Sequence, residues 1–320
     1  MKKTIIITDT HFGVRQNSLI WLQSQKDYIY NELIPYIKQC KEEIQIIHCG
    51  DVFDSRSAIN PIIATEVRKI FISLSDLCPV YILAGNHDFY SPTSDKISSL
   101  DLILNNIENL TIVRDYIYHL CDSILVPWYE FTIEKLKKAI DFYNPKYVFC
   151  HADLANMEKE YIPLFYGIQV YSGHIHEEWK KDNLTNLGST YALTFADANQ
   201  QKGVYILEDD ELSLVAAKNI IRFNRFSENS IFDIDIEKNK DNYVQISIDK
   251  MKLLNSEYEK RISELSNGIK NFEVILTENM QDNKEITNFS VFDIKKECEN
   301  NVPCELKEKF YEIFKKLENK

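Results

Sequence analysis

The chain has 320 residues and a net charge of −12, and its shares of hydrophobic residues (44%) and charged residues (27%) are those of an ordinary globular protein. Seven scattered cysteines argue against a disulfide framework, and no apolar run is long enough to cross a bilayer, so we expect a cytoplasmic protein without a membrane segment. The negative charge also argues against strong DNA binding by the isolated chain.

Short apolar runs alternate with longer amphipathic stretches over the first 175 residues. The apolar runs predict strands at residues 4–8, 44–49, 80–84, 147–150 and 168–172. The amphipathic stretches predict helices at about residues 19–40, 62–77 and 133–142. Alternation of this kind predicts a mainly parallel sheet with helices packed outside it.

The pattern changes beyond residue 175. Three short strands, predicted at residues 184–187, 203–207 and 212–216, are separated by turn residues and favour an antiparallel sheet. The two parts together predict an α/β fold of two packed mixed β-sheets flanked by helices. We expect residues 1–220 to form this large domain, with four layers in the order α/β/β/α.

A new alternation of strands and helices begins at about residue 221. A strand containing Val244, Ile246 and Ile248 precedes a predicted helix at about 254–265 and a strand at 272–276. The chain ends in a predicted helix with an apolar stripe of Leu306, Phe310, Phe314 and Leu317, which favours core packing over a partner surface. We interpret residues 221–320 as a small α/β accessory or cap domain.

Five polar motifs follow predicted strands of the large domain. They are Asp9-Thr10-His11, Gly50-Asp51-Val52-Phe53-Asp54, Gly85-Asn86-His87-Asp88, Cys150-His151 and Gly173-His174-Ile175-His176. Because ligands bind beyond the carboxyl ends of strands in open α/β sheets, we expect the motifs to meet in one crevice. Turn formation would explain Asp, Asn and Gly at these positions, but it would not explain five of the seven histidines of the chain.

Seven side chains of these motifs would suffice for two adjacent divalent ions. Asp51 is the expected bridge, because a carboxylate between two ions offsets their mutual repulsion. The other ligands form two sets of three: Asp9, His11 and His176 for one ion, and Asn86, His151 and His174 for the second. A mixed nitrogen and oxygen shell without thiolate suits Mn²⁺, Fe²⁺ or Zn²⁺. The pattern predicts hydrolysis of a phosphoester by a water that the ions make acidic.

Four neighbouring residues are candidates for supporting roles. His87 could act as a general acid towards the leaving oxygen, with Asp88 orienting its ring. For Asp54, a role in supporting the metal ligands or in capping a helix is as plausible as a catalytic one. Arg56 lies close to Asp54 in sequence and could clamp a phosphate.

Other polar residues have simpler interpretations. His48 and His119 lie inside apolar runs, so we expect both to be buried core histidines. Residues 222–226, Arg-Phe-Asn-Arg-Phe, favour an edge strand between domains over a nucleic-acid contact. Residues 177–181 favour a solvated loop over a substrate contact.

The order of the five motifs resembles that of the calcineurin-like metallophosphoesterases over residues 4–176. Within that family the chain is similar to the nuclease subunits of double-strand-break-processing complexes, of the SbcD type and of T-even phages. This closer resemblance depends on Gly13, on Gly50–Asp54, on Val126-Pro127-Trp128 and on residues 187–195, where Thr190 replaces a proline. Archaeal and eukaryotic members have a second histidine where this chain has Asp54.

The resemblance carries further expectations. It implies two metal ions held by the seven ligands named above, with His87 as the catalytic histidine and manganese as the metal. It also implies DNA phosphodiesterase activity, a capping domain, an SMC-like coiled-coil ATPase partner of the SbcC type, and a homodimer within a heterotetramer. The location would be the cytoplasm, or the host cytoplasm if a phage encodes the chain.

Two alternative functions stay open at this point. The acidic charge and Arg56 favour a metallophosphatase or nucleotide phosphodiesterase that acts on a small or protein-borne phosphoester. A non-catalytic scaffold that keeps the fold to bind an ATPase or a DNA end is disfavoured by the intact ligand set.

Overall fold

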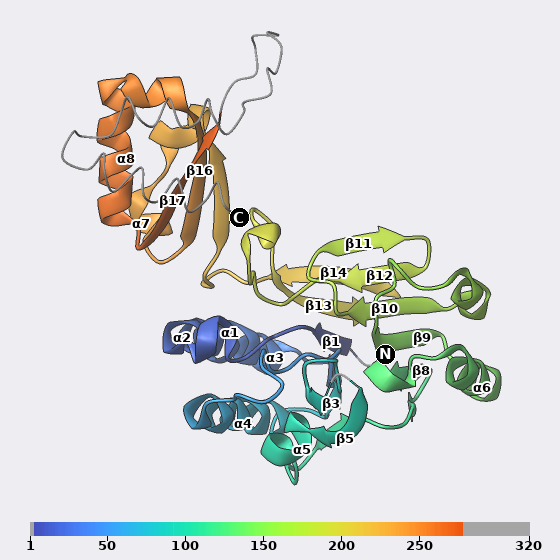
Figure 1. The fold of residues 1–320 in the computed structure, drawn as a ribbon. Coiled ribbons are helices and arrows are strands. Elements are labelled where there is room, and N and C mark those ends of the chain that lie inside the picture. The colour runs from blue at the N-terminus through green and yellow to red at the C-terminus, as the bar shows by residue number, and fades with distance from the viewer. Residues whose placement is uncertain (1–2, 92, 278–320) are drawn as a thin grey trace, which may run out of the picture. The chain divides into compact units, whose positions relative to one another are not determined.

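Two six-stranded β-sheets stack face to face in the structure, a computed structural model that describes residues 3–91 and 93–277. Helices cover the outer face of each sheet (Figure 1). The resulting order of helix, sheet, sheet and helix confirms the predicted α/β fold of two packed mixed sheets flanked by helices.

The first sheet has the strand order β14-β13-β1-β2-β3-β6. Its parallel strands are β1 (Lys3–Ile7), β2 (Ile44–His48), β3 (Val80–Leu83) and β6 (Leu110–Val113). β13 (Gly203–Glu208) pairs antiparallel with β1, and β14 (Glu211–Ala216) pairs antiparallel with β13. The outer helices are α2 (Leu19–Tyr28), α3 (Ile34–Gln39), α4 (Pro61–Ser75) and α5 (Ser99–Leu104). In β1, Ile5 and Ile7 pack in the helix-side core while Ile6 packs in the core between the sheets, so β1 is buried on both faces.

The second sheet has the strand order β11-β12-β10-β9-β8-β7. Its strands are β7 (Tyr118–Leu120), β8 (Ser123–Val126), β9 (Tyr147–His151), β10 (Gln169–Gly173), β11 (Glu178–Lys181) and β12 (Leu184–Leu187). The outer core packs under α6 (Ile133–Tyr143) and the 3-10 helix η3 (Lys159–Phe165). Phe149 and Tyr171 of this sheet meet Ile6 of the first in the core between the sheets.

The elements predicted for residues 1–175 are confirmed to within one or two residues at most ends. The helix predicted at 19–40 is interrupted by a π-helical turn, η1 (Ile29–Leu33), between α2 and α3. The single antiparallel sheet expected from the later strands is wrong. β12 joins the second sheet parallel to β10, whereas β13 and β14 complete the first sheet. The residue pattern identifies a strand, but long-range packing selects its partner.

The described residues after 220 form a third sheet with the order β15-β16-β17. Its strands are β15 (Phe223–Ser227), β16 (Tyr243–Asp249) and β17 (Asn271–Thr277), with helices α7 (Ile236–Asn239) and α8 (Ser256–Gly268) beside them (Figure 1). Val244, Ile246 and Leu265 belong to a hydrophobic core of their own. β15 is the edge strand expected from residues 222–226. The predicted final helix lies outside the described residues, and the domain boundary at residue 220 stays a prediction.

Three predictions for individual segments have mixed outcomes. His48 is fully buried, with Nε2 3.0 Å from Thr10 Oγ1, as expected. The core position expected for His119 is wrong, because this residue lies exposed on the edge strand β7 and stacks on Tyr143 at 4.3 Å. Most of the loop expected at residues 177–181 is the edge strand β11. Among the described residues, no helix has both the length and the apolar character required to span a membrane.

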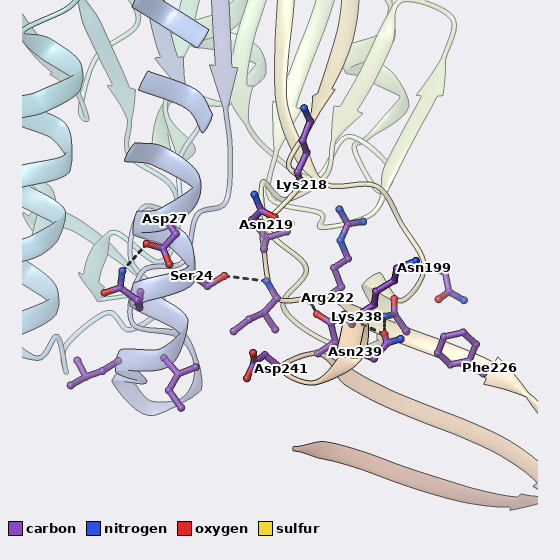
Figure 2. Close-up of a pocket in the computed structure, with 17 residues that line it drawn as sticks. Ser24, Asp27, Asn199, Lys218, Asn219, Arg222, Phe226, Lys238, Asn239 and Asp241 are labelled. Carbon is purple, nitrogen blue, oxygen red and sulfur yellow. Dashed lines mark hydrogen bonds between the residues drawn. The ribbon is translucent and has the colours of Figure 1, made fainter. Parts of the chain in front are cut away.

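A groove of about 1040 Å³ lies between α2 and the segment that leads into the third sheet. Figure 2 shows Ser24 and Asp27 of α2 on one side and Asn219, Arg222 and Asn239 on the other. The backbone N–H of Ile221 donates to Ser24 Oγ across this junction at 3.1 Å. Polar and apolar side chains both line the groove, and hydrogen bonds such as this one help to hold the junction.

Candidate metal centre

The loops after β1 and β2 are joined by backbone hydrogen bonds beyond the ends of the strands. The N–H of Asp9 donates to Gly50 O at 3.1 Å, and the N–H of His11 donates to Asp51 O at 3.1 Å. Phe12 and Phe53 then form a further parallel bridge. This continuation of the ladder brings the first two motifs together, as the sequence predicted.

Close approach at the centre requires glycine at two positions. A Cβ atom at Gly85 would lie 2.3 Å from Asp51 Oδ1. Gly50 has a φ of 93°, and a Cβ there would lie 2.5 Å from His151 Nδ1. The glycines that open the second and third motifs thus make room for two proposed ligands.

The first half of the centre contains Asp9, His11 and His176. Nε2 of His11 lies 3.1 Å from Nε2 of His176 and 3.8 Å from Asp9 Oδ1. Nε2 of His176 lies 3.9 Å from the same carboxylate oxygen. Their ligand atoms all lie within 4.8 Å of one another, so the three side chains can converge on one cation.

The second half of the centre contains Asn86, His151 and His174. Oδ1 of Asn86 lies 2.9 Å from His151 Nε2 and 2.9 Å from His174 Nδ1. Nδ1 of His151 lies 2.7 Å from the carbonyl oxygen of Cys49, to which it donates when it carries the proton. That contact leaves Nε2 of His151 pointing at the other side chains of this half.

Asp51 lies between the two halves. Its Oδ2 is 3.7 Å from Nε2 of His11, and its Oδ1 is 3.4 Å from Nε2 of His151. It also belongs to ligand-atom groups with His11 and His87 and with His151 and His174. The structure therefore brings together all seven side chains for which the sequence predicted a metal role.

The charges of the centre are strongly coupled. Burial lowers the pKa of His11, but hydrogen bonds to neighbouring carboxylates outweigh it and raise that pKa to about 10. Burial likewise lowers the pKa of His151, but Asp51 raises it to about 9. Burial lowers the pKa of both His174 and His176. Without metal, protons on two imidazoles thus compensate the buried carboxylates, and this is a donor set that divalent cations fit.

His87 and Asp54 form a second contact beside the centre. Nδ1 of His87 lies 2.6 Å from the backbone carbonyl of Asp54, and the His87 N–H donates to Asp51 Oδ1 at 2.8 Å. The carboxylate of Asp54 lies 3.5 Å from Nδ1 of His11. Asp54 therefore contacts both a proposed ligand and the proposed general acid.

Asp88 does not orient the His87 ring as the sequence suggested. Its fully buried carboxylate accepts hydrogen bonds from the backbone N–H groups of Val52, Phe53 and Gly85 at 3.0, 3.2 and 2.9 Å. Burial and the charge of Asp51 raise the pKa of Asp88 to about 7. The side chain thus fastens the second motif to the third, because it satisfies buried N–H groups that would otherwise lack partners.

Two further side chains alter the predicted picture. Arg56 lines a separate cavity of about 370 Å³ with Tyr90 and Ile97, and no described contact joins it to the centre. Trp128 packs against the centre, with its ring 4.8 Å from the ring of His174. The segment Val126-Pro127-Trp128, on which the family resemblance partly depends, was the signal available in the sequence.

Comparison with known proteins gives one family match and two relatives. Residues 2–213 match the family model described as calcineurin-like phosphoesterase. The chain is 28% identical over 197 residues to the DNA double-strand break repair protein Mre11 of Saccharolobus solfataricus, an alignment that covers 56% of this chain and 51% of that protein. It is 23% identical over 225 residues to exonuclease subunit 1 of Enterobacteria phage T4, with 65% of each chain covered.

The alignments thus span between half and two thirds of the length of these curated relatives. The family match covers all five motifs and both six-stranded sheets except for the last residues of β14. Members of this family are hydrolytic phosphoesterases that use divalent metals, which agrees with the ligand groups described above. The chain belongs to the calcineurin-like phosphoesterase family.

Proposed function

We propose that this phosphoesterase is a metal-dependent DNA nuclease that hydrolyses phosphodiester bonds. The observation that carries the proposal is the position of Asp51 between two groups of ligand atoms, as a two-ion centre requires. DNA as the substrate is supported by the names of the two relatives, a DNA double-strand break repair protein and an exonuclease subunit.

Seven side chains would hold the ions, with Asp51 shared between them. The remaining ligands are Asp9, His11 and His176 on one side and Asn86, His151 and His174 on the other. When bound, the ions would supply positive charge that attracts a phosphate and makes a water acidic. The mixture of imidazole, carboxylate and amide ligands suits Mn²⁺, Fe²⁺ or Zn²⁺, and the resemblance to the family favours Mn²⁺ among them.

His87 is the proposed general acid. When its Nδ1 carries a proton it donates to Asp54 O, which leaves Nε2 as the ring nitrogen that can face a leaving oxygen. Asp88 would contribute by holding the backbone of the second and third motifs, and the carboxylate of Asp54 by its contact with His11.

The resemblance of the motifs extends the proposal to domains and partners. Residues 1–220 would form the nuclease domain, and residues 221–320 would form a cap that shapes access for DNA. The partner would be an SMC-like coiled-coil ATPase of the SbcC type, with a homodimer of this chain inside a heterotetramer. The net charge of −12 opposes DNA binding by the chain alone, which favours a role for a partner in holding DNA.

A nuclease assay tests this function. The purified chain with Mn²⁺ should cut single- or double-stranded DNA, alone or with its ATPase, and Asp51→Asn should abolish cleavage together with metal binding. Cleavage of neither DNA form under either condition would refute the nuclease proposal. Faster turnover of phosphomonoesters than of DNA would instead identify a metallophosphatase.

A further inference from the structure

We propose that Lys202, paired with Asp197, is a positioning residue for one half of the metal centre. Its ammonium holds the backbone of His176 and so fixes the ligand group of Asp9, His11 and His176. The inference rests on the proposed two-ion function, but its test measures metal binding and does not require DNA cleavage.

Lys202 is a charged side chain buried almost completely. It is 4% exposed and its partner Asp197 is 2% exposed, with Nζ 2.9 Å from Oδ1. Nζ also donates to the carbonyl of His176 at 2.7 Å and to Ser189 Oγ at 3.2 Å. All three protons of the ammonium are thus used. A buried ion pair gives little stability beyond that of a well-packed apolar pair, so stability alone is a weak explanation for this one.

The carbonyl of His176 receives two hydrogen bonds at once. Besides Lys202 Nζ, the backbone N–H of Ser189 donates to it at 3.2 Å. Gly188 has a φ of 70°, and a Cβ atom there would lie 2.9 Å from this carbonyl oxygen. The His176 side chain itself is 33% exposed, and its ring touches the ring of His11. Because the imidazole of His176 is partly exposed, few side-chain contacts fix its position. The hydrogen bonds to the His176 carbonyl fix its backbone instead.

Thr190, close to Ser189 in the chain, holds the backbone of the residue that precedes Asp9. Thr190 donates from its N–H and from Oγ1 to the carbonyl of Thr8, at 2.9 and 2.8 Å, and its Oγ1 accepts from the Thr8 N–H at 3.1 Å. Asp197 accepts from the N–H groups of Leu193 and Thr194, both at 3.0 Å. Residues 187–195, on which the family resemblance partly depends, therefore support both Asp9 and His176. The Lys202–Asp197 ion pair holds this segment in place.

The support reaches one half of the centre more directly than the other. Its described contacts end on Thr8, beside Asp9, and on His176. The second half has contacts of its own, because Asn86 lies against His151 and His174, and His151 lies against the Cys49 carbonyl. The halves meet where the His174 N–H donates to both carboxylate oxygens of Asp9 at 3.1 Å. Loss of Lys202 should therefore weaken one ion more than the other.

The test is a titration of Lys202→Met with Mn²⁺, followed by electron paramagnetic resonance and equilibrium dialysis. The wild type should bind two ions, and the variant should bind one of them about 10- to 100-fold more weakly, the range for loss of a group that orients a ligand. Lys3→Met is the matched control. Lys3 is also a largely buried lysine, 11% exposed and paired with Glu208, but it lies at the opposite end of β1 from the centre.

A companion variant covers the case in which Lys202→Met fails to fold. Lys202→Met combined with Asp197→Asn removes both charges and leaves an oxygen for the N–H groups of residues 193 and 194, so it should fold and show the same selective loss. Wild-type affinity for both ions in a folded variant would overturn the inference. Equal weakening of both ions, or a wild type with a single class of site, would overturn it as well.

The titration separates this inference from the proposed function. A wild type that binds two ions but cleaves no DNA refutes the nuclease proposal, and the effect of Lys202 on metal binding still stands. A DNA-cleaving wild type whose Lys202 variants bind both ions normally refutes only the positioning role.

Discussion

Asp54 contacts His87 with its backbone carbonyl and His11 with its carboxylate. Its backbone carbonyl meets Nδ1 of His87 at 2.6 Å, and its carboxylate lies 3.5 Å from Nδ1 of His11. The sequence left open whether Asp54 supports the metal ligands, caps a helix or takes part in catalysis. The geometry favours a supporting role, because the carbonyl determines which ring nitrogen of His87 carries a proton.

Substitution of the proposed general acid should separate chemistry from metal binding. His87→Ala should bind both ions and lose about 10²- to 10⁴-fold in turnover, the usual contribution of acid catalysis. Metal content by mass spectrometry and steady-state kinetics on bis-p-nitrophenyl phosphate check both parts. Wild-type turnover in a metal-loaded variant would remove His87 from this role.

Metal binding should release protons. In the metal-free protein the pKa values of His11 and His151 are raised to about 10 and about 9, so near neutral pH each imidazole carries a proton on both ring nitrogens. Ligation must displace one of these two protons. Apparent Mn²⁺ affinity should rise with pH up to about pH 9 to 10 for the same reason. Calorimetric titrations in HEPES and in Tris should give different apparent enthalpies. Identical enthalpies in the two buffers would contradict the predicted release.

At the scale of elements, the sequence predicted the strands that carry the motifs. β1, β2, β3, β9 and β10 were predicted because each is a largely apolar run followed by a polar motif. β4 (Phe89–Ser91), β5 (Ser94–Ser98), β6, β7 and β8 were missed, because strands of three to five residues give too short a pattern.

The site was predictable to a similar degree. The convergence of the seven proposed ligands follows from the rule for strand ends, and the structure brings them together. The contacts of Asp88 could not be predicted, because they depend on where the N–H groups of Val52, Phe53 and Gly85 meet in space. The position of Arg56 could not be predicted for the same reason, since closeness in sequence does not decide which cavity a side chain enters.

The tight loop packing makes a prediction about Gly85. Gly85→Ala should place a methyl group against Asp51, lower the free energy of unfolding by about 1–3 kcal/mol and weaken metal binding. Gly167→Ala is the control, because a Cβ atom there has nothing within 4 Å, although its φ of 77° still carries a backbone cost. Thermal unfolding and metal titration of the two variants measure the difference. Equal effects would show that packing against Asp51 is unimportant.

At the scale of the whole molecule, α2 connects the large domain to the third sheet. The ring of Trp21, which is 3% exposed, lies 6.0 Å from the ring of Phe223 and 5.9 Å from that of Tyr243. The guanidinium of Arg15 lies 5.5 and 5.2 Å from the same two rings. The third sheet has its own core, but these contacts stabilise its junction with α2.

Truncation after residue 220 should separate metal binding from stability. All seven proposed ligands precede residue 177, so a 1–220 fragment should still bind two ions. It should melt at a lower temperature, because Trp21 loses its aromatic partners. Trp21→Ala in the full chain should cost about 3–5 kcal/mol, as is typical for a large buried aromatic residue. A fragment that folds but binds no ions would show that residues 221–320 complete the centre.

Four of the proposed ligands have a left-handed backbone: Asp9, His11, Asp51 and His174, with φ values of 48°, 43°, 54° and 88°. Aspartate, asparagine and histidine tolerate this conformation better than most residues with a side chain. Each position is therefore restricted twice, once by coordination chemistry and once by chain geometry. A saturation library at position 51 should accordingly reject glutamate, although glutamate carries the same carboxylate group. Few substitutions of any kind should be tolerated at these four positions.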